Sequence, residues 1–430
     1  MNLFNIHVSR RRFLKASAVV AAGATLPGWF VEESRGLEAA TKPLSANDKP
    51  GIALVGCGGQ GSGDCNWAKN YGNVVAVCDV DAKHLDDAAK AFNTPNKYKD
   101  FRKVMERDDV HVIITGTPDH WHTLINLAAV KAGKDIYSEK PLTLTIDEGK
   151  HLVQAVKNSK TVFQTGSQQR SDPRFRLACE LVRNGRIGKL VHMVSGLPTG
   201  PREGPFTPKP VPPELDWDFY QGQTPATDYV PERTHWNFRW WYDYSGGQMT
   251  DWGAHHNDIC QWGNGTERSG PVEIEGKSLV DMIPGGYTAA AQYKVELKYG
   301  NGVTMTITDK APNGIRFEGT EGWIFVDRGH IEASKKELLE EPLPAGAIRL
   351  YKSDNHMGNF FDCIRTRKPP ICEAEIGHRS ISVAHLGVIA VRLGRPLKWN
   401  PDLEQFVDDQ EADKWLSRPM RAPYNYSFIA

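Results

Sequence analysis

The sequence predicts an α/β protein with two sheets of different kinds, and three features of the chain support this fold class. Between residues 51 and 170, apolar runs of strand length alternate with stretches of helix length. The first apolar run ends in a glycine-rich turn that opens a helix. Residues 285–308 alternate between apolar and polar, as antiparallel strands do. We therefore expect an N-terminal doubly wound parallel sheet, followed by a domain that contains antiparallel strands.

The elements of the first domain follow one another regularly. Apolar and β-branched runs predict strands at 52–55, 74–77, 110–115, 135–137 and 161–164. Helix-length stretches lie between them, at 82–92, 123–132 and 146–157, and a further helix follows the first strand. Strands that alternate with helices form a parallel sheet, because each helix returns the chain to the end of the sheet at which the previous strand began, so that the next strand runs in the same direction.

The second half of the chain begins with an irregular segment. Residues 197–231 are rich in proline, glycine and aromatics, and a segment of this length without regular structure is typical of a functional or interface-forming excursion. Residues 299–302 (YGNG) predict a hairpin turn. Amphipathic helices are expected at 355–365 and 376–392, and residues 395–430 are expected to form an extended tail.

Composition points to a small-molecule partner. The chain has 430 residues, and Lys plus Arg equals Asp plus Glu at 52 each, so the basic excess of a nucleic-acid binder is missing. With 40% hydrophobic and 24% charged residues the chain is ordinarily globular. Its seven cysteines are scattered without a C-x-x-C pair, so neither a zinc ribbon nor a disulfide framework is indicated.

The N-terminus predicts export. Residues 9–15 read SRRRFLK and precede a short stretch rich in alanine, which matches a twin-arginine signal and is too short for a bilayer span. The alternative is a basic amphipathic helix that begins the domain. We expect a signal peptide over residues 1–40, a mature protein that is periplasmic or secreted, and no stable membrane span after its removal.

The glycine-rich turn predicts a dinucleotide site. Such a turn lets the backbone approach a pyrophosphate, and the helix N-terminus offers free N–H groups. Asp79 ends the second strand, where a carboxylate accepts hydrogen bonds from the adenine ribose and favours NAD over NADP. Asp79 could instead cap the following helix. The predicted cofactor-binding residues of this region are Gly56, Gly58, Gly59, Gln60, Gly61 and Asp79.

Two further strands end in loops that should line the same crevice, since ligands of doubly wound sheets bind beyond the carboxyl ends of the strands. The first loop contains Thr117, Pro118 and His122, and the second contains Glu139 and Lys140. Lys140 would lie near the nicotinamide, where it can stabilise the alkoxide that forms as hydride leaves carbon. The alternative for Glu139 and Lys140 is a solvated loop pair.

A later segment supplies a candidate base. On a helix, Asp251 and His255 lie four residues apart on one face, so that the carboxylate can orient the imidazole as a proton acceptor. A metal site is the alternative, because these two residues, His120, His122 and His256 are zinc-compatible ligand types. It requires distant loops to converge, so we expect no metal.

Taken together, the glycine loop, residues 117–122, residues 139–141 and the Asp251/His255 segment resemble the Gfo/Idh/MocA oxidoreductase family. The resemblance implies a Rossmann domain over 49–170, an α/β domain with an open, largely antiparallel sheet over 171–395, a C-terminal tail over 396–430 and a homo-oligomer. It also assigns Lys140, Asp251 and His255 to the catalytic positions and Glu139 to cofactor contact. Weaker candidates for substrate contact are Arg170, Trp240 and His256.

These features predict an exported NAD-dependent oxidoreductase that moves hydride between nicotinamide and the hydroxyl carbon of a carbohydrate, polyol or glycoside. Free NAD is scarce outside the cytoplasm, so we expect the cofactor to be held tightly. One alternative is a redox-neutral NAD-dependent glycosidase, which oxidises, eliminates and re-reduces. The other is a sugar-binding protein without activity on a retained Rossmann scaffold.

Overall fold

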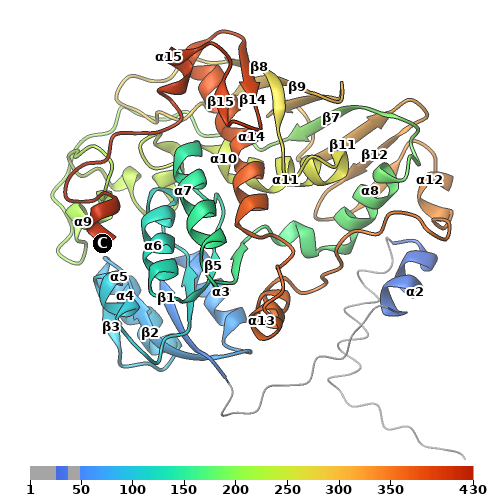
Figure 1. Ribbon diagram of the computed structural model, residues 1–430. Helices are drawn as coiled ribbons and strands as arrows, with labels where there is room; N and C mark the ends of the chain where they lie inside the picture. The colour runs from blue at the N-terminus through green and yellow to red at the C-terminus, as the bar shows by residue number, and fades with distance from the viewer. Residues whose placement is uncertain (1–25, 37–48, 430) are drawn as a thin grey trace, which may run out of the picture.

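The structure is a computed structural model that describes residues 26–36 and 49–429 (Figure 1). Two sheets and the helices packed on them make up the fold. The twin-arginine motif lies outside the described residues.

The first sheet is parallel throughout, as predicted. Its six strands run in the order β3-β2-β1-β4-β5-β6, and every neighbouring pair is parallel. This order is that of a dinucleotide-binding Rossmann sheet. The strands are β1 (Gly51–Val55), β2 (Asn73–Cys78), β3 (Lys97–Tyr98), β4 (Val112–Thr115), β5 (Asp135–Ser138) and β6 (Phe163–Thr165).

Helices cover both faces of this sheet, and several begin at a side-chain cap. Asp81 accepts from Lys83 N and His84 N at the start of α4, and Thr145 accepts from Glu148 N at the start of α7. The helices contributed by this part of the chain are α3 (Gly59–Ala68), α4 (Ala82–Ala91), α5 (Phe101–Met105), α6 (Asp119–Lys131) and α7 (Ile146–Lys157).

A helix from the far end of the sequence completes the first domain. In α13 (His356–Thr366), Met357, Phe360 and Phe361 belong to the same core cluster as Ile52 of β1. Figure 1 shows α13 beside α3, beneath the sheet. The predicted boundary at residue 170 is therefore wrong in one respect, because the chain returns to cover a face that the first 170 residues leave partly open.

The second sheet has nine strands in the order β13-β12-β11-β7-β10-β9-β8-β14-β15. All its neighbours are antiparallel except β7 and β10, which are parallel. The predicted hairpin at 299–302 joins β9 to β10. The strands are β7 (Leu190–Gly196), β8 (Pro271–Ser278), β9 (Tyr293–Tyr299), β10 (Thr304–Thr308), β11 (Gly314–Gly319), β12 (Trp323–Val326), β13 (Ile331–Ala333), β14 (Leu397–Asn400) and β15 (Gln405–Phe406).

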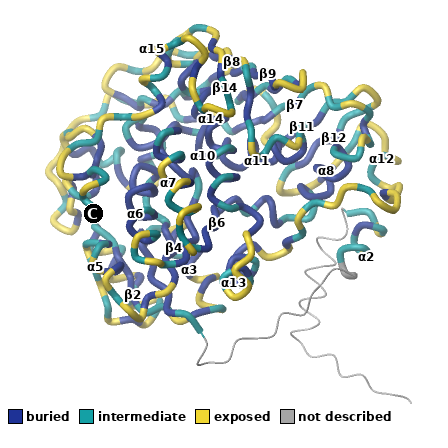
Figure 2. The backbone as a smooth tube through the Cα atoms, viewed as in Figure 1, coloured by how far each residue is buried: buried dark blue, intermediate teal, exposed yellow. Residues whose placement is uncertain are grey.

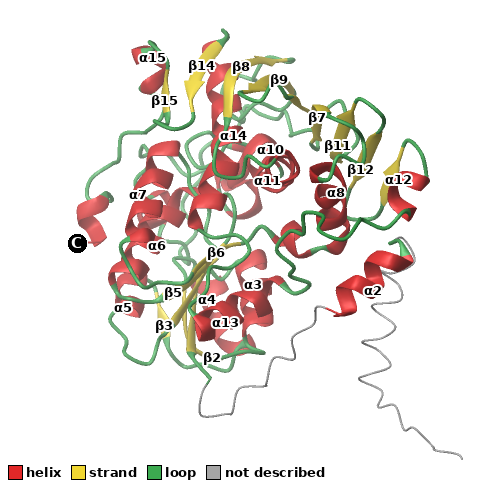
Figure 3. Cartoon of the chain, turned by 45° about the vertical axis from the view of Figure 1, so that its right-hand side comes forward, coloured by secondary structure: helices red, strands yellow, loops and turns green. Residues whose placement is uncertain are grey.

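Helices pack on one face of the second sheet, between it and the Rossmann domain (Figure 3). Along β9 buried residues alternate with more exposed ones, so the other face of the sheet is far more open than the helix-covered face (Figure 2). The remaining helical elements are α8 (Pro173–Arg183), α9 (Trp217–Gln221), α10 (Gln248–Asp251), α11 (Gly253–Asn264), α12 (Glu337–Glu340), α14 (Ala374–Leu393), α15 (Gln410–Asp413), η2 (Gln168–Ser171), η3 (Pro231–Arg233), η4 (His235–Trp240) and η5 (Tyr426–Ile429).

The last 35 residues are not the extended tail that the sequence predicts. Strand β14 pairs with β8, and Leu397 and Trp399 are buried on its inner face. Apolar residues two apart with Lys398 exposed between them are a strand signal that is short enough to be missed. Residues 397–406 therefore extend the second sheet.

A short helix lies within the stretch predicted as signal peptide. In α2 (Gly28–Gly36), Phe30 is buried under the guanidinium of Arg176, whose carbon lies 4.4 Å from the ring centroid. Trp29 donates its indole N–H to Leu339 O at 3.0 Å, and Arg176 donates to Ser34 Oγ at 2.7 Å. Cleavage at the predicted signal boundary near residue 40 would therefore remove α2, a helix that packs on the second domain. Among the described residues no helix is long and apolar enough to span a bilayer.

Candidate active site

A cavity of about 520 Å³ opens at the carboxyl ends of β1, β2, β4 and β5. Its wall on the Rossmann side includes Gly58, Asp79, Thr117 and Lys140. Aromatic side chains from the irregular segment form the opposite wall: Phe219, Tyr220, Trp236 and Phe238. The size and position are those of a cofactor site in a doubly wound sheet.

The glycine loop is shaped for close approach of a ligand. Gly56 has φ of +91°, and a Cβ there would lie 2.5 Å from the backbone nitrogen of Thr117. A Cβ on Gly61 would lie 2.1 Å from Gly56 O, so the helix packs directly on the turn. Gly58 and Gly59 face open space instead. This arrangement fits a pyrophosphate at the N-terminus of α3.

Asp79 ends β2 at the wall of the cavity. One carboxylate oxygen accepts from Cys57 N at 2.7 Å and the other from Asp81 N at 2.9 Å. Burial raises the pKa of Asp79, although these two N–H groups oppose the shift. The alternative role in helix capping falls to Asp81 instead. Each carboxylate oxygen accepts only one of these bonds, and Asp79 lines the cavity, as a ribose-binding carboxylate requires.

The loop after β4 is tied to the loop after β5. Thr117 and Pro118 line the cavity, whereas His122 lies beneath it, with Nδ1 2.6 Å from Pro141 O and Nε2 2.8 Å from Thr117 O. Burial lowers the pKa of His122, and the two carbonyls oppose this. His122 therefore joins the two loops and does not line the cavity as the sequence predicts.

Glu139 interacts with Asp64, a buried acid that was not among the residues predicted from the sequence. Burial, followed by the charge of Glu139, raises the pKa of Asp64 well above its usual value. Gln60 donates to Asp64 at 3.1 Å and Gln168 donates to Glu139 at 3.1 Å. Asp64 lies one helical turn after Gly61, but a single acid in a helix carries no sequence signal of its own.

Lys140 and Asp251 form the central ion pair. Nζ of Lys140 lies 2.5 Å from Oδ1 of Asp251 and also donates to the Asp251 carbonyl at 3.2 Å. Arg239 lies 3.3 Å from the same carboxylate oxygen. Burial alone would raise the pKa of Asp251, but the charges of Lys140 and Arg239 outweigh it and lower the pKa.

The predicted contact between Asp251 and His255 is not formed. The helix breaks at Trp252, so that Asp251 ends α10 and His255 lies in the first turn of α11. Among the described residues, Nδ1 of His255 is buried without a hydrogen-bond partner. The prediction relied on helical spacing alone, whereas the carboxylate binds Lys140 of the Rossmann domain.

The imidazole ring of His255 is uncharged in the folded protein. Burial, followed by the charges of Lys140 and Arg328, lowers the pKa of its imidazole well below the usual value. The ring is therefore neutral at neutral pH, and the same burial and charges make it a weaker proton acceptor than a free imidazole. His255 does not line the cofactor cavity, although the charge of Lys140 contributes to the lowering of its pKa.

Three residues predicted to contact substrate are buried and lie outside the cavity lining. Arg170 is 2% exposed and binds Asp258 through two 2.7 Å hydrogen bonds. His256 is buried, with Nδ1 2.9 Å from Gly196 O. Trp240 packs beside Tyr287 in an aromatic cluster. None of the three lines the cavity, whereas Trp236 and Phe238 of the same aromatic stretch do.

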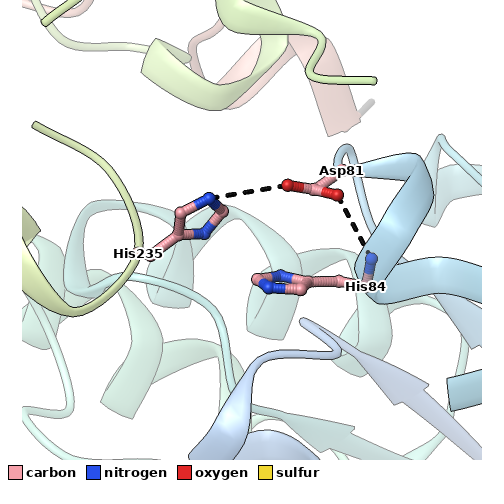
Figure 4. Close-up of side chains that lie close together, drawn as sticks. All are labelled: Asp81, His84 and His235. Atoms are coloured by element: carbon pink, nitrogen blue, oxygen red, sulfur yellow. Dashed lines mark hydrogen bonds and ion pairs between the residues drawn. The ribbon is translucent and has the colours of Figure 1, made fainter. Parts of the chain in front are cut away.

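The candidate metal ligands of the sequence do not gather. His120 is bound to Tyr220 O at 2.8 Å, and His122 and His256 are bound to backbone carbonyls. Within the described part of the chain, the ligand-type atoms that do come together belong to Asp81, His84 and His235, all within 4.8 Å of one another (Figure 4). They lie at the rim of the cofactor cavity.

Comparison with protein families agrees with this architecture. Residues 51–167 match the NAD-binding Rossmann fold of the Gfo/Idh/MocA oxidoreductase family, and residues 202–426 match its C-terminal alpha/beta domain. Residues 7–27 match the twin-arginine translocation signal. The chain belongs to the Gfo/Idh/MocA oxidoreductase family and is an NAD-dependent oxidoreductase with a signal for the twin-arginine route.

Individual relatives are distant. A myo-inositol 2-dehydrogenase of Thermotoga maritima is 23% identical over 81% of this chain and 98% of its own. A levoglucosan dehydrogenase of Pseudarthrobacter phenanthrenivorans is 36% identical, but over only 27% of this chain and 30% of its own length. A glycosyl hydrolase family 109 protein of Shewanella pealeana is 26% identical over 43% of this chain and 45% of its own.

Solved structures share the fold. A levoglucosan dehydrogenase in complex with NADH superposes with a TM-score of 0.61 at 18% identity, covering 81% of this chain and 99% of that one. An aldose-aldose oxidoreductase of Caulobacter crescentus gives 0.60 at 20% identity, over 81% and 99%.

Proposed function

We propose that this enzyme oxidises a secondary hydroxyl of a carbohydrate, polyol or glycoside, with His255 as the base and Lys140 as the group that stabilises the alkoxide. The observation that carries the proposal is the buried ion pair of Lys140 with Asp251, beside a neutral imidazole and at the end of the cofactor cavity. Oxidation of an alcohol needs a proton acceptor and a cation at the oxygen, and this arrangement supplies both.

Each of the three residues has its own role in the proposed reaction. His255 accepts the hydroxyl proton, and the ammonium of Lys140 donates a hydrogen bond to the oxygen as negative charge develops. Asp251 fixes the position of that ammonium at 2.5 Å and so acts through Lys140 and not through His255. NAD would supply the hydride acceptor at this site. The glycine loop and Asp79 would hold the cofactor.

Two kinds of support favour a sugar-like substrate. Relatives are named as dehydrogenases of levoglucosan and of inositol, which are polyhydroxylated rings. In this chain, Trp236 and Phe238 line the cavity and can stack on the C–H faces of such rings.

A redox-neutral glycosidase is the second candidate. The similarity to glycosyl hydrolase family 109 proteins favours it. It would use the same first step, in which the substrate is oxidised at a hydroxyl carbon. The carbonyl would acidify the neighbouring C–H, loss of that proton would expel the aglycone, water would add to the resulting double bond, and the hydride would then return to the carbonyl carbon.

One incubation distinguishes the two candidates. The protein as exported is supplied with a panel of free sugars, polyols and aryl glycosides, with and without added NAD, and the products are separated by mass. An oxidoreductase accumulates a product two hydrogens lighter together with NADH. A glycosidase releases the aglycone with no net NADH. Absence of both from every substrate class would contradict the proposal.

Export and assembly complete the proposal. The twin-arginine route carries folded proteins, so the enzyme would reach the periplasm or the medium with its cofactor already bound. The open face of the second sheet would pack against a second copy of the chain, as expected for an exposed sheet of this extent.

A further inference from the structure

We propose that residues 214–239 form a cover over the adenosine half of the cofactor site, and that residues 418–429 latch this cover shut, so that NAD is a resident cofactor. The inference rests on NAD binding in the cavity and does not depend on which substrate the enzyme oxidises.

The cover forms the outer wall of the cavity. Phe219 and Tyr220 of α9 and His235 of η4 face the cavity from outside the Rossmann fold. Across from them lie Asp79 and Phe101. Since Asp79 marks the ribose position, the wall encloses the adenosine end of the site.

Backbone hydrogen bonds join the cover to the loop that carries Asp79. Ala82 N donates to Glu214 O at 2.9 Å, and Asp216 N donates to Val80 O at 3.1 Å. Between these two bonds, Leu215 forms a β-bridge with Asp81. The cover therefore begins with an antiparallel β-bridge to the β2–α4 loop.

Side chains close the other end of the cover. His235 places Nε2 3.5 Å from Asp81 Oδ2, and its ring centroid lies 4.6 Å from that of His84 (Figure 4). His235 has φ of +53°, a backbone conformation that non-glycine residues seldom adopt. The chain thus keeps a strained residue at the point where the cover meets α4.

The C-terminal segment latches α9. Arg421 binds Asp218 at 2.6 Å and also donates to Gly222 O at 3.1 Å. The hydroxyl of Tyr424 donates to the second Asp218 oxygen at 2.7 Å. Its ring stacks on Phe219, with centroids 5.7 Å apart and planes 21° apart. Phe219 is the residue that faces the cavity, so the latch supports the wall directly.

The same segment is anchored to the Rossmann domain. Phe428 packs near Trp121 of α6 and Phe101 of α5, and the guanidinium carbon of Arg102 lies 3.9 Å above its ring. Figure 1 shows the C-terminus between α9 and the α5–α6 helices. Departure of the adenosine end therefore requires the latch and the cover to separate from the Rossmann domain together.

The test measures cofactor exchange on the full-length protein. Holoenzyme is mixed with a large excess of isotopically labelled NAD, and the unlabelled NAD that remains bound is quantified by mass spectrometry over time. The double variant Arg421→Ala/Tyr424→Phe removes the latch contacts with Asp218. The matched control is Arg395→Ala, which removes an arginine–aspartate pair with Asp409 in the same C-terminal region, away from the cover.

The latch predicts at least tenfold faster exchange in the double variant and unchanged exchange in the control. Two milder variants serve if the double variant does not fold. Tyr424→Phe alone keeps the aromatic ring, and His235→Ala removes a side chain that is 47% exposed. Both should remain folded and exchange NAD faster than the wild type. Wild-type protein that loses its NAD during a desalting step would overturn the proposal. So would equal exchange rates in the wild type and the folded latch variants. Neither result depends on turnover, so failure of the proposed reaction would be seen separately.

Discussion

Nζ of Lys140 lies 2.5 Å from Oδ1 of Asp251, and this pair joins the end of β5 in the Rossmann domain to α10 in the second domain. Both side chains are about one-tenth exposed. A pair enclosed to this degree depends on both partners, because loss of one leaves a buried charge. The pair thus holds the Lys140 ammonium at the boundary between the Rossmann domain and the second domain.

Replacing Asp251 tests whether the carboxylate acts through Lys140. We expect Asp251→Asn to lower kcat about 100-fold, since the ammonium loses its positioning partner. In a Lys140→Met background, Asp251→Asn should lower kcat little further, because the two residues act as a unit. Steady-state kinetics on the four proteins measure this coupling. Asp243→Asn, which removes a 3.3 Å ion pair with Arg233 on the same segment, is the control. Fully additive losses would show that Asp251 works elsewhere.

Replacing His255 tests the base. His255→Gln keeps a polar side chain of similar size but cannot accept the proton, so we expect the rate of nicotinamide reduction to fall about 10²- to 10⁴-fold. Binding of NAD should not change, because His255 does not line the cofactor cavity. Single-turnover absorbance of the nicotinamide and NAD titration give the two readouts. A wild-type reduction rate in this variant would assign the base to another group.

Replacing Asp79 tests the ribose contact. Asp79→Ala should weaken NAD binding about tenfold or more and raise the affinity for NADP relative to NAD, because the carboxylate that repels a 2′-phosphate is gone. Calorimetric titration of both cofactors into cofactor-free protein measures the ratio. Asp86→Asn, on the exposed side of α4, should leave it unchanged. Unaltered affinities in Asp79→Ala would place the ribose elsewhere.

The parallel sheet and its glycine turn could be predicted because their signals are local. Strands β1, β2 and β4 each contain a continuous apolar run, and the turn follows β1 directly, whereas the two-residue strand β3 has no such signal and was not predicted. Gly56, Asp79 and Lys140 were found in this way, and all three line the cavity. Lys140 could be placed because parallel strands end at a common edge.

Features that depend on distant segments could not be predicted. The cover over the cavity, the return of α13 beneath the first sheet and the ion pair of Arg170 with Asp258 each join residues far apart in the chain. The carboxylate of Asp251 binds Lys140, which lies 111 residues earlier in the chain, so no local signal predicts this pair. Spacing alone therefore led to His255 as its partner.

The buried histidines predict a defined pH dependence of stability. Burial lowers the pKa of His385 to about 3, although the carbonyl of Thr143 opposes the shift. The folded protein therefore keeps this ring neutral, while the unfolded chain protonates it below about pH 6.5. The stabilising contribution is present above that pH and is lost as the pH falls toward 3.

Comparison with His385→Gln isolates this group from the others. The advantage of the wild type in free energy of unfolding should shrink by about 1.4 kcal/mol per pH unit between about pH 6 and pH 4. Denaturant titration at several pH values measures both proteins. A difference that stays constant across this range would mean that His385 titrates normally in the folded state.

The helix α2 predicts where the mature protein begins. Because Phe30 is 1% exposed and Trp29 and Ser34 are hydrogen-bonded to the second domain, we expect α2 to remain after export. Intact-mass measurement of the exported protein should therefore include residues 28–36. Phe30→Ala should lower the free energy of unfolding by about 3 kcal/mol. Glu32→Gln, on the exposed side of α2, is the control. A mature N-terminus beyond residue 36 would contradict the prediction.

The proposed function depends on hydride transfer between a sugar-like hydroxyl carbon and NAD held in this cavity. Protein purified after native export is mixed with sugars and polyols deuterated at carbon, and its nicotinamide is then released and examined by mass spectrometry. We expect near-stoichiometric NAD per chain in both the wild type and His255→Gln, and transfer of one deuterium to the ring in the wild type alone. Nicotinamide that stays unlabelled with every substrate, or a protein that neither contains NAD nor takes it up, would contradict it.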